Sequence, residues 1–221
     1  MLKDNLLLDS ARPFSNVEIL KSDARNIVPG CPILVSAGGK LMKNDMTQRW
    51  FALRATYSRE LKVRDSLSQL GVRTFVPMMW RNREVDGKIE KKLVPAVSNL
   101  CFVFWDRPSI DSYIRSFGDR TPVNYYWDRT LNQPLVIPSQ AMEDFITVAS
   151  SMDEDLIYLT DITEKLREGQ TVEVMEGPFK GVTGKIVRIK KNRRVLVELP
   201  GFLAVTTNYL PPQSLRLRGG E

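Results

Sequence analysis

The chain has 221 residues and a net charge of +6, and its fractions of hydrophobic (43%) and charged (26%) residues are those of an ordinary soluble globular protein. It contains no histidine, which excludes histidine-based acid–base catalysis, Ser-His and Cys-His nucleophile pairs and the common zinc sites; its two cysteines are too few for a disulfide framework. The sequence also has no Gly-rich phosphate loop and no metal-type Asp/Glu cluster, so we expect neither an enzyme nor a bound metal or cofactor.

Residues 1–46 have no clear periodicity and contain several prolines and glycines, which predicts a partly ordered N-terminal extension. Segments 17–20 and 33–35 have the composition of short strands. Residues 1–10 lack the basic start and unbroken apolar run of a signal peptide. The longest apolar runs, such as 100–105, are too short to span a bilayer. We therefore expect a cytoplasmic protein with no membrane contact.

Regular structure is predicted to begin at residue 49. The apolar, aromatic-rich segment 50–56 is typical of a strand. Ser58 is a candidate N-cap for a helix that Gly71 closes, because Val63, Leu67 and Leu70 recur at helical spacing. A second strand is predicted over 72–76.

The next segments complete an N-terminal domain over 47–150. A hairpin is predicted over 78–92 with an Asp-Gly turn, and the most apolar strand, 100–105, is expected at the centre of the sheet. A short helix over 108–117 would begin at Asp106 or Ser109, a strand follows at 122–127, and Ser139 is a candidate cap for a last helix. The predicted fold class is α+β, an antiparallel sheet flanked by helices.

A change of pattern marks a second domain. Residues 151–166 are acidic and polar, which predicts a linker. Short β-branched strands with glycine-rich turns are then expected, and Asn192 is a candidate turn residue. They predict a small antiparallel barrel over 167–218. The four strands are 171–175, 183–189, 193–199 and 202–206.

The charges are divided unevenly between these parts. Residues 49–120 carry fourteen basic and eight acidic side chains, and residues 167–221 carry ten basic and five acidic ones. Between them, 138–166 holds seven acidic side chains against one lysine. Basic domains favour contact with a nucleic-acid backbone, whereas the acidic stretch has the character of a solvated connector.

Two motifs carry a family resemblance. GQTVEVMEGPFKG at 169–181, continued by GKIV at 184–187, resembles the KOW motif. RWFAL at 49–53, a helix and GVRTFVP at 71–77 resemble the opening of a NusG N-terminal domain. Both occur in the right order, so the chain resembles NusG-type transcription factors. The resemblance implies a NusG-type α/β sandwich followed by a KOW barrel of the SH3-like type.

Within that family, the aromatic-rich strand at 100–104 and the divergent barrel tip are similar to the specialised paralogues of the UpxY and RfaH type. This resemblance implies an antitermination and elongation factor that promotes read-through of long surface (capsular) polysaccharide operons. In such proteins the N-terminal domain binds the clamp helices of the largest RNA polymerase subunit. Here the corresponding strand reads SNLCF at 98–102, which implicates Val97, Leu100 and Phe102.

The resemblance implies two further surfaces on the N-terminal domain. A short helix that meets the other large polymerase subunit corresponds to Ser109, Asp111 and Ser112. The non-template DNA strand of the bubble, or nascent RNA, would be held by cations and an aromatic face around the first strand–helix junction. The candidates for this contact are Arg54, Tyr57, Arg59, Lys62, Arg64, Arg73 and Arg115.

In the barrel, the family's partner loop corresponds to GFLA at 201–204, which makes an exposed Phe202–Leu203 pair the candidate for docking ribosomal protein S10. The family's Gly-Arg pair is absent there, which argues against binding of termination factor Rho. The β-branched residues of this region favour a barrel over a helical resting state. We expect a monomer.

Two alternatives stay open at this stage. A KOW-type RNA- or ribosome-binding protein without polymerase contact would fit the basic barrel, but it leaves the upstream domain unexplained. An exposed apolar patch at Val97, Leu100 and Phe102 would favour the polymerase-binding interpretation, whereas burial of these side chains would remove that support.

Overall fold

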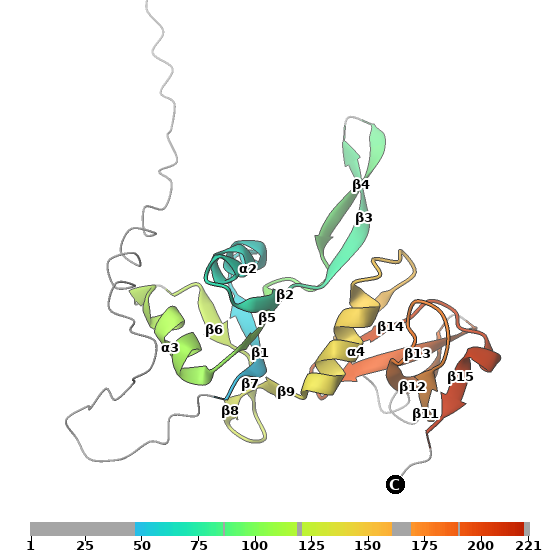
Figure 1. Cartoon of the computed structure of the whole chain (residues 1–221). Helices are drawn as coiled ribbons and strands as arrows, with labels where there is room; N and C mark the ends of the chain where they lie inside the picture. The colour runs from blue at the N-terminus through green and yellow to red at the C-terminus, as the bar shows by residue number, and fades with distance from the viewer. Residues whose placement is uncertain (1–46, 86, 119–120, 161–168, 190, 219–221) are drawn as a thin grey trace, which may run out of the picture. The chain divides into compact units, whose positions relative to one another are not determined.

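The computed structural model describes residues 47–85, 87–118, 121–160, 169–189 and 191–218 (Figure 1). Residues 44–221 form one compact unit. The predicted N-terminal extension and its two short strands lie outside the described residues. In the described part of the chain, no helix is both long and apolar enough to cross a membrane.

An antiparallel sheet organises residues 49–137. Its order is β2 (Arg73–Phe75), β5 (Leu100–Trp105), β1 (Arg49–Ala55) and β6 (Val123–Tyr125), and β9 (Val136–Ile137) also pairs with β1. In the central pair, Ala52 lies opposite Phe102 and Trp50 opposite Phe104. The prediction that the most apolar strand lies inside the sheet is therefore confirmed.

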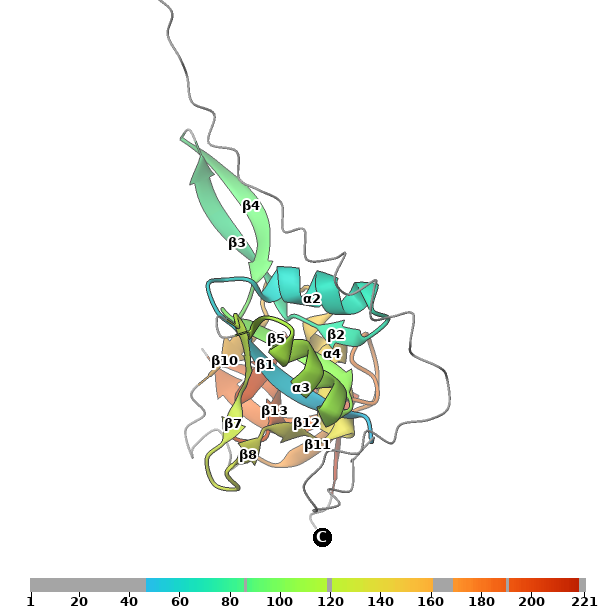
Figure 2. The same cartoon turned by 90° about the vertical axis from the view of Figure 1, so that its left-hand side faces the viewer.

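The two faces of this sheet have different covers. Helices α2 (Glu60–Gln69) and α3 (Arg107–Arg115) bury Phe51, Leu53, Cys101 and Val103 on one face (Figure 2). The third helix, α4 (Ser139–Ala149), packs on the other face, against Trp50 and Phe102 among others. The sandwich is thus a sheet with helices on both sides, because alternate residues of β1 and β5 are apolar on both faces.

Two hairpins leave the sheet. The longer one consists of β3 (Met78–Val85) and β4 (Lys88–Pro95), and it projects away from the rest of the fold in Figures 1 and 2. Gly87 has φ +73°, which fits the predicted tight turn. The shorter hairpin pairs β7 (Trp127–Asp128) with β8 (Gln133–Pro134).

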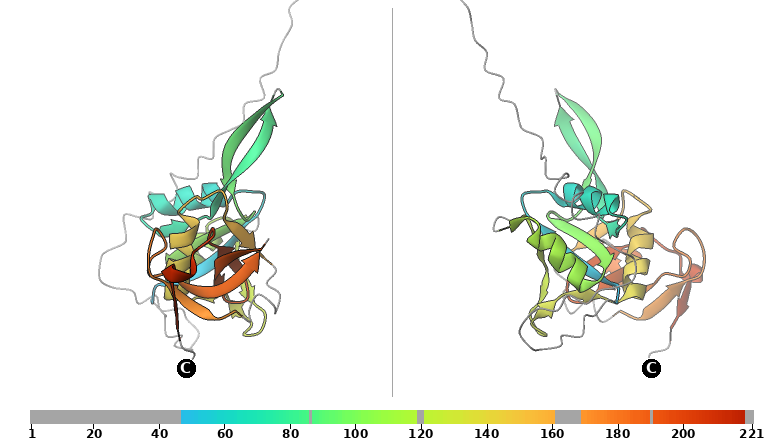
Figure 3. Two further views of the ribbon diagram at one scale, coloured as in Figure 1. Left: turned by 90° about the vertical axis from the view of Figure 1, so that its right-hand side faces the viewer. Right: turned by 60° about the vertical axis from the view of Figure 1, so that its left-hand side comes forward.

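The C-terminal strands form a small barrel-like sheet (Figure 3). Its order is β10 (Ile157–Leu159), β14 (Leu203–Thr206), β13 (Asn192–Leu199), β12 (Thr183–Ile189), β11 (Thr171–Val174) and β15 (Leu215–Leu217), with a 3-10 turn, η3 (Pro212–Ser214), before β15. Gly184 is required in β12 because a Cβ there would collide with the Leu196 carbonyl and the Val195 side chain. The α+β fold class with a KOW barrel is confirmed.

Several local predictions need correction. Ser58 does not cap α2: it has φ +52°, and its N–H donates to the Asn99 side chain at 2.9 Å, so Arg59 takes the N-cap position. Ser139 is the first residue of α4 and not its cap. Of the two candidates, Asp106 is the cap of α3 and accepts a hydrogen bond from Ser109 N–H at 2.9 Å.

Two further corrections concern the barrel. The left-handed turn residue before β13 is Lys191 (φ +68°), and Asn192 already belongs to the strand. Part of the predicted acidic linker is strand β10, which pairs with β14. Its three residues, Ile157, Tyr158 and Leu159, are the apolar part of an otherwise polar stretch, and pairing with the barrel half-buries them.

Candidate functional site

The central feature is one side of the sheet, which we call the apolar face: Trp50 and Ala52 on β1, and Leu100 and Phe102 on β5. All four side chains are at most 1% exposed. Strand alternation sends their neighbours Cys101 and Val103 to the opposite face, under α2 and α3. The apolar face is therefore separate from the core that holds those two helices.

Helix α4 covers part of the apolar face. The Phe145 ring lies edge-on to Phe102, with ring centroids 5.9 Å apart, and to Phe75 at 6.3 Å. At the rim, Arg73 forms two 2.8 Å hydrogen bonds with the Glu143 carboxylate and lies over the Trp50 ring, 5.1 Å from its centroid. The ion pair is exposed, so its contribution to stability is small.

The barrel covers the rest of the apolar face. Phe202, in the turn before β14, lies edge-on to Phe102 and to Tyr126, with centroid separations of 6.3 Å and 4.7 Å. Tyr158 on β10 contacts Phe145 at 6.3 Å and donates a hydrogen bond to the Met78 carbonyl at 3.2 Å. Burial raises the pKa of Tyr158 to about 12, so this donor keeps its proton at neutral pH. Sandwich and barrel consequently share one apolar cluster.

The contact between sandwich and barrel determines whether the predicted apolar sites are exposed or buried. Leu100 and Phe102 are fully buried and Val97 is partly buried, so the expected exposed patch is absent in this arrangement, and the support that such a patch would have given to polymerase binding is removed. Phe202 and Leu203 do not form an exposed pair either. Leu203 lies in the barrel interior, and Phe202 is partly buried against the sandwich. Phe102 and Phe202 thus cover each other, whereas Leu203 is buried by the barrel itself.

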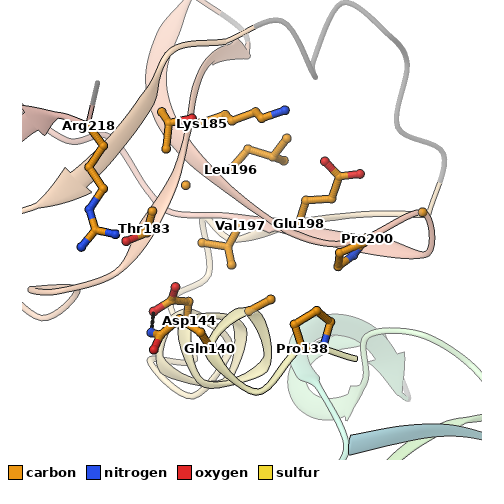
Figure 4. A pocket seen from close by; sticks show the side chains of 14 residues that line it. Pro138, Gln140, Asp144, Thr183, Lys185, Leu196, Val197, Glu198, Pro200 and Arg218 are labelled. Atoms are coloured by element: carbon orange, nitrogen blue, oxygen red, sulfur yellow. Dashed lines mark hydrogen bonds between the residues drawn. The ribbon is translucent and has the colours of Figure 1, made fainter. Parts of the chain in front are cut away.

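Beside these ring contacts, an open hollow of about 690 Å³ lies at the edge of the contact between α4 and strands β12 and β13 (Figure 4). Asp144 points into it from α4 and accepts a hydrogen bond from Gln140 at 3.1 Å. The Thr183 backbone N–H on β12 also donates to the Asp144 carboxyl, and burial raises the pKa of Asp144. The contact between α4 and the barrel is therefore incompletely packed and includes a buried acid.

The first strand–helix junction presents an exposed aromatic side chain. Tyr57 is 83% exposed and has φ +61°, in a turn that the Asn99 side chain holds through Ser58 N–H. The Arg59 guanidinium lies 5.5 Å from the centroid of the Tyr57 ring. Arg54 and Lys62 are exposed nearby in sequence, at the end of β1 and in the first turn of α2. An aromatic face beside cations is suited to stacking on unpaired bases.

The other predicted cations are engaged differently. Arg64 forms an ion pair with Asp65 at 2.7 Å. Arg73 is held by Glu143 and Trp50 on the α4 side of the sheet. Arg115 is exposed at the end of α3, where it bonds Ser112 at 3.4 Å. The structure thus places Arg59 against the Tyr57 ring and leaves Arg54 and Lys62 exposed, and it places Arg64, Arg73 and Arg115 in contacts of their own.

The predicted second contact lies on α3. Ser112 is exposed, whereas Ser109 is partly buried and donates its N–H to the helix cap, Asp106. Asp111 accepts a 2.9 Å hydrogen bond from the Tyr125 hydroxyl, and burial together with this bond raises the pKa of Tyr125. A hollow lined by Asp111, Ile114, Arg115 and Trp127 adjoins these residues.

Sequence reasoning missed the aromatic residues that complete the cover, namely Tyr126, Phe145 and Tyr158. In the sequence, Phe145 recurs with Met142, Ile146 and Ala149 at helical spacing, which indicates only that it lies on the apolar side of a helix. No signal in the sequence pairs it with Phe102 and Tyr158.

Known proteins resemble both parts of the chain. The sequence profile of the family described as transcription termination factor nusG matches residues 48–146, and the KOW motif profile matches 168–198. The transcription termination/antitermination protein NusG of Streptococcus pyogenes serotype M1 is 22% identical over 172 residues, covering 69% of this chain and 87% of that protein. Transcription elongation factor Spt5 of Methanocaldococcus jannaschii is 31% identical over 72 residues, covering 32% of this chain and 49% of that protein. The solved structure titled "Domain interaction in Thermotoga maritima NusG" aligns with 77% of this chain and 97% of its own, at a TM-score of 0.41 and 16% identity.

Proposed function

The chain belongs to the NusG family of transcription factors, which are not enzymes, and we propose that it is an elongation and antitermination factor that binds RNA polymerase through its apolar face. The contact to the polymerase clamp helices is assigned to Leu100 and Phe102 with Val97 at the rim. Polymerase is the partner because the factors named in the comparisons act in transcription elongation and termination.

One observation supports this assignment best: part of the cover over Phe102 is Phe202 of the barrel, while Phe145 on α4 supplies another part. The barrel has a smaller apolar cluster of its own, Val187, Leu196 and Ala204, besides the cluster that it shares with the sandwich. The shared contact includes aromatic rings, a hydrogen bond and the packing of α4 on β13 and β14. We infer that the barrel can leave the sandwich while each part stays folded.

Two states follow from this geometry. In the closed state, which the structure describes, Phe202 occupies the apolar face. In the open state, the apolar face becomes available to an apolar helical surface of polymerase, and Phe202 becomes available to a partner of the barrel. Ribosomal protein S10 is the proposed barrel partner, and the missing Gly-Arg pair argues against Rho. Phe202 and the apolar face bury each other in the closed state and would bind outside partners in the open state. Partner binding and the closed state therefore exclude each other.

The remaining surfaces are assigned by their chemistry. Tyr57 with Arg54, Arg59 and Lys62 would hold the non-template DNA strand by stacking and phosphate contacts. The exposed side of α3 around Ser112 would meet the second large polymerase subunit. Read-through of long surface-polysaccharide operons is proposed as the biological role on the resemblance to specialised paralogues alone.

The test is co-purification of the tagged full chain with RNA polymerase. Val97→Asp places a charge at the rim of the apolar face, where partial exposure allows the variant to fold. Val136→Asp is the matched control, since Val136 is 36% exposed on β9 of the same sheet. We expect Val97→Asp to reduce polymerase recovery at least tenfold and Val136→Asp to leave it unchanged.

Two results would overturn the proposal. Equal recovery with both variants would remove the apolar face as the polymerase contact. Recovery of ribosomes without polymerase by the wild-type chain would replace the elongation factor with a KOW-type RNA- or ribosome-binding protein.

A further inference from the structure

The segment that follows α4 is bound to the barrel along most of its length. Strand β10 pairs with β14 at each of its residues. On one face of this strand, Leu159 packs on the smaller apolar cluster of the barrel, and on the other face Tyr158 packs on the shared cluster. Residues 157–159 therefore belong to the barrel both by strand pairing and by packing.

A buried arginine holds the turn before β10. Arg194, on β13, is 6% exposed, and its Nη1 donates hydrogen bonds to the carbonyl oxygens of Asp155 at 2.6 Å and Thr207 at 2.8 Å. It forms no ion pair with an acid of the described chain, and its buried Nε has no hydrogen-bond partner there. Because burial of a cation without a carboxylate is costly, the two charge-assisted bonds to carbonyls are what stabilises it. Arg194 thus joins the turn before β10 to the chain that follows β14.

A second side chain completes this attachment. The Asn208 side-chain amide donates to the Asp153 carboxylate at 2.6 Å, and the same carboxylate accepts the Asp155 N–H at 2.9 Å. We call Arg194 and Asn208, with their bonds to residues 153–155, the clasp. The clasp ties the turn to the barrel from its first residue onward.

Only residues 150–152 separate the clasp from α4, which ends at Ala149. The Ser151 hydroxyl still donates to the Val148 carbonyl at 2.8 Å, so Ser151 stays attached to the helix. Met152 follows with φ +50°, a left-handed conformation that residues other than glycine rarely adopt, and it is 42% exposed. Strained positions of this kind are concentrated at functional sites and switch regions. Met152 is therefore the candidate hinge.

We propose that residues 153–159 move as part of the barrel, held by the clasp, and that the barrel opens by rotating about Met152. The existence of an open state rests on the proposed function. The chain from Ala149 to Asp153 spans at most about 14 Å, so the opened barrel stays beside α4.

The clasp also favours closing. If β10 detached from the barrel, the free connection would lengthen from residues 150–152 to at least residues 150–159. The effective concentration of the barrel at the apolar face would then fall by roughly sixfold or more, because it decreases at least as the −3/2 power of the connection length. Arg194 is thus a positioning residue for the closed state.

Hydrogen–deuterium exchange of the full chain, followed in peptides that cover β10 and β14, tests the clasp. Arg194→Met removes both carbonyl bonds and keeps a long side chain. Arg188→Met is the matched control, because it removes the same charge from an exposed position of the neighbouring strand β12. Asn208→Ala removes only the bond to Asp153, and it carries the test if circular dichroism shows that Arg194→Met does not fold.

We expect exchange of β10 to rise roughly tenfold in Arg194→Met and about threefold in Asn208→Ala, while exchange of β11 and β12 stays unchanged. Arg188→Met should exchange like the wild type. Wild-type exchange of β10 in the folded clasp variants would overturn the clasp, and so would an equal rise in Arg188→Met.

A distance measurement tests the hinge. Spin labels at Gln69→Cys on α2 and Lys180→Cys in the barrel, both exposed positions, report the separation of sandwich and barrel in a Cys31→Ser chain. The remaining cysteine, Cys101, is buried.

Addition of Phe202→Ala favours the open state, and we expect it to shift the label distance while the distribution stays narrow. Further addition of Asn208→Ala should broaden the distribution. A broad distribution with the clasp intact, or an unshifted distance in Phe202→Ala, would overturn the hinge. Failure of the wild-type chain to recover polymerase would refute the proposed function instead, and β10 exchange would still decide whether the clasp exists.

Discussion

Removal of the Phe202 side chain tests the closed state directly. Phe202→Ala deletes the ring that lies against Phe102 and Tyr126, and it leaves the barrel interior intact because Phe202 faces the sandwich. The variant should therefore favour the open state without unfolding either part.

The size of the effect can be worked out from the contacts. Each aromatic pair contributes about 0.5–1.5 kcal/mol beyond its buried area, and the partial burial of the ring adds roughly 1 kcal/mol. The loss of closing free energy is then about 2–4 kcal/mol, which is roughly a 30- to 900-fold increase in the ratio of open to closed molecules.

Hydroxyl-radical footprinting with mass spectrometry measures the exposure of individual side chains in the full chain. Oxidation of Phe102 should rise in the variant, and polymerase recovery should rise with it. Phe51, buried on the opposite face of the sheet, should stay protected and serves as the internal control. Tyr209→Ala is the matched variant, because Tyr209 is an aromatic residue of the barrel that is 55% exposed.

Two outcomes would refute this reasoning. Unchanged oxidation of Phe102 in Phe202→Ala would mean that the ring does not hold the barrel in place. Reduced polymerase recovery would mean that Phe202 assists binding and does not compete with it.

Four further predictions follow from buried and exposed groups. Burial raises the pKa of Cys101 to about 12, so in a Cys31→Ser chain the thiol should resist a disulfide reagent at pH 8 until the protein unfolds; rapid native labelling would contradict this. The raised pKa also gives the sign of a pH dependence: the contribution of Cys101 to stability is fully present below pH 9 and is lost as the pH rises toward 12, because the thiol ionises first in the unfolded chain; the difference in urea unfolding between the wild type and Cys101→Ala measures it. Gly184→Ala should destabilise the barrel by roughly 2 kcal/mol or more in thermal unfolding, because the new Cβ meets the Leu196 backbone. Tyr57→Ala should weaken binding of a single-stranded oligonucleotide by about 1–3 kcal/mol with no change in melting temperature; an equal affinity would exclude base stacking there.

Local pattern determined much of the architecture. Strand alternation and helical spacing predicted β1, α2, β5 and the barrel strands, since they report the apolar side of each element over a few residues. The local pattern did not show that Leu100 and Phe102 are buried, since the resemblance assigned both residues to an exposed patch. The local pattern also failed where a distant group overrode local preference. At Ser58, the N–H donates to the side chain of Asn99, which lies 41 residues away in the sequence.

Only the tertiary structure decided what covers the apolar face. Phe202 reaches Phe102 from 100 residues away, and Tyr158, from a stretch with the composition of a linker, joins the same cluster. An apolar side chain is equally favourable against a core, a second domain or a partner, so its presence in the sequence does not select among them. The choice depends on a few kcal/mol of complementary contacts between parts that are remote along the chain, and those contacts exist only once both parts have folded.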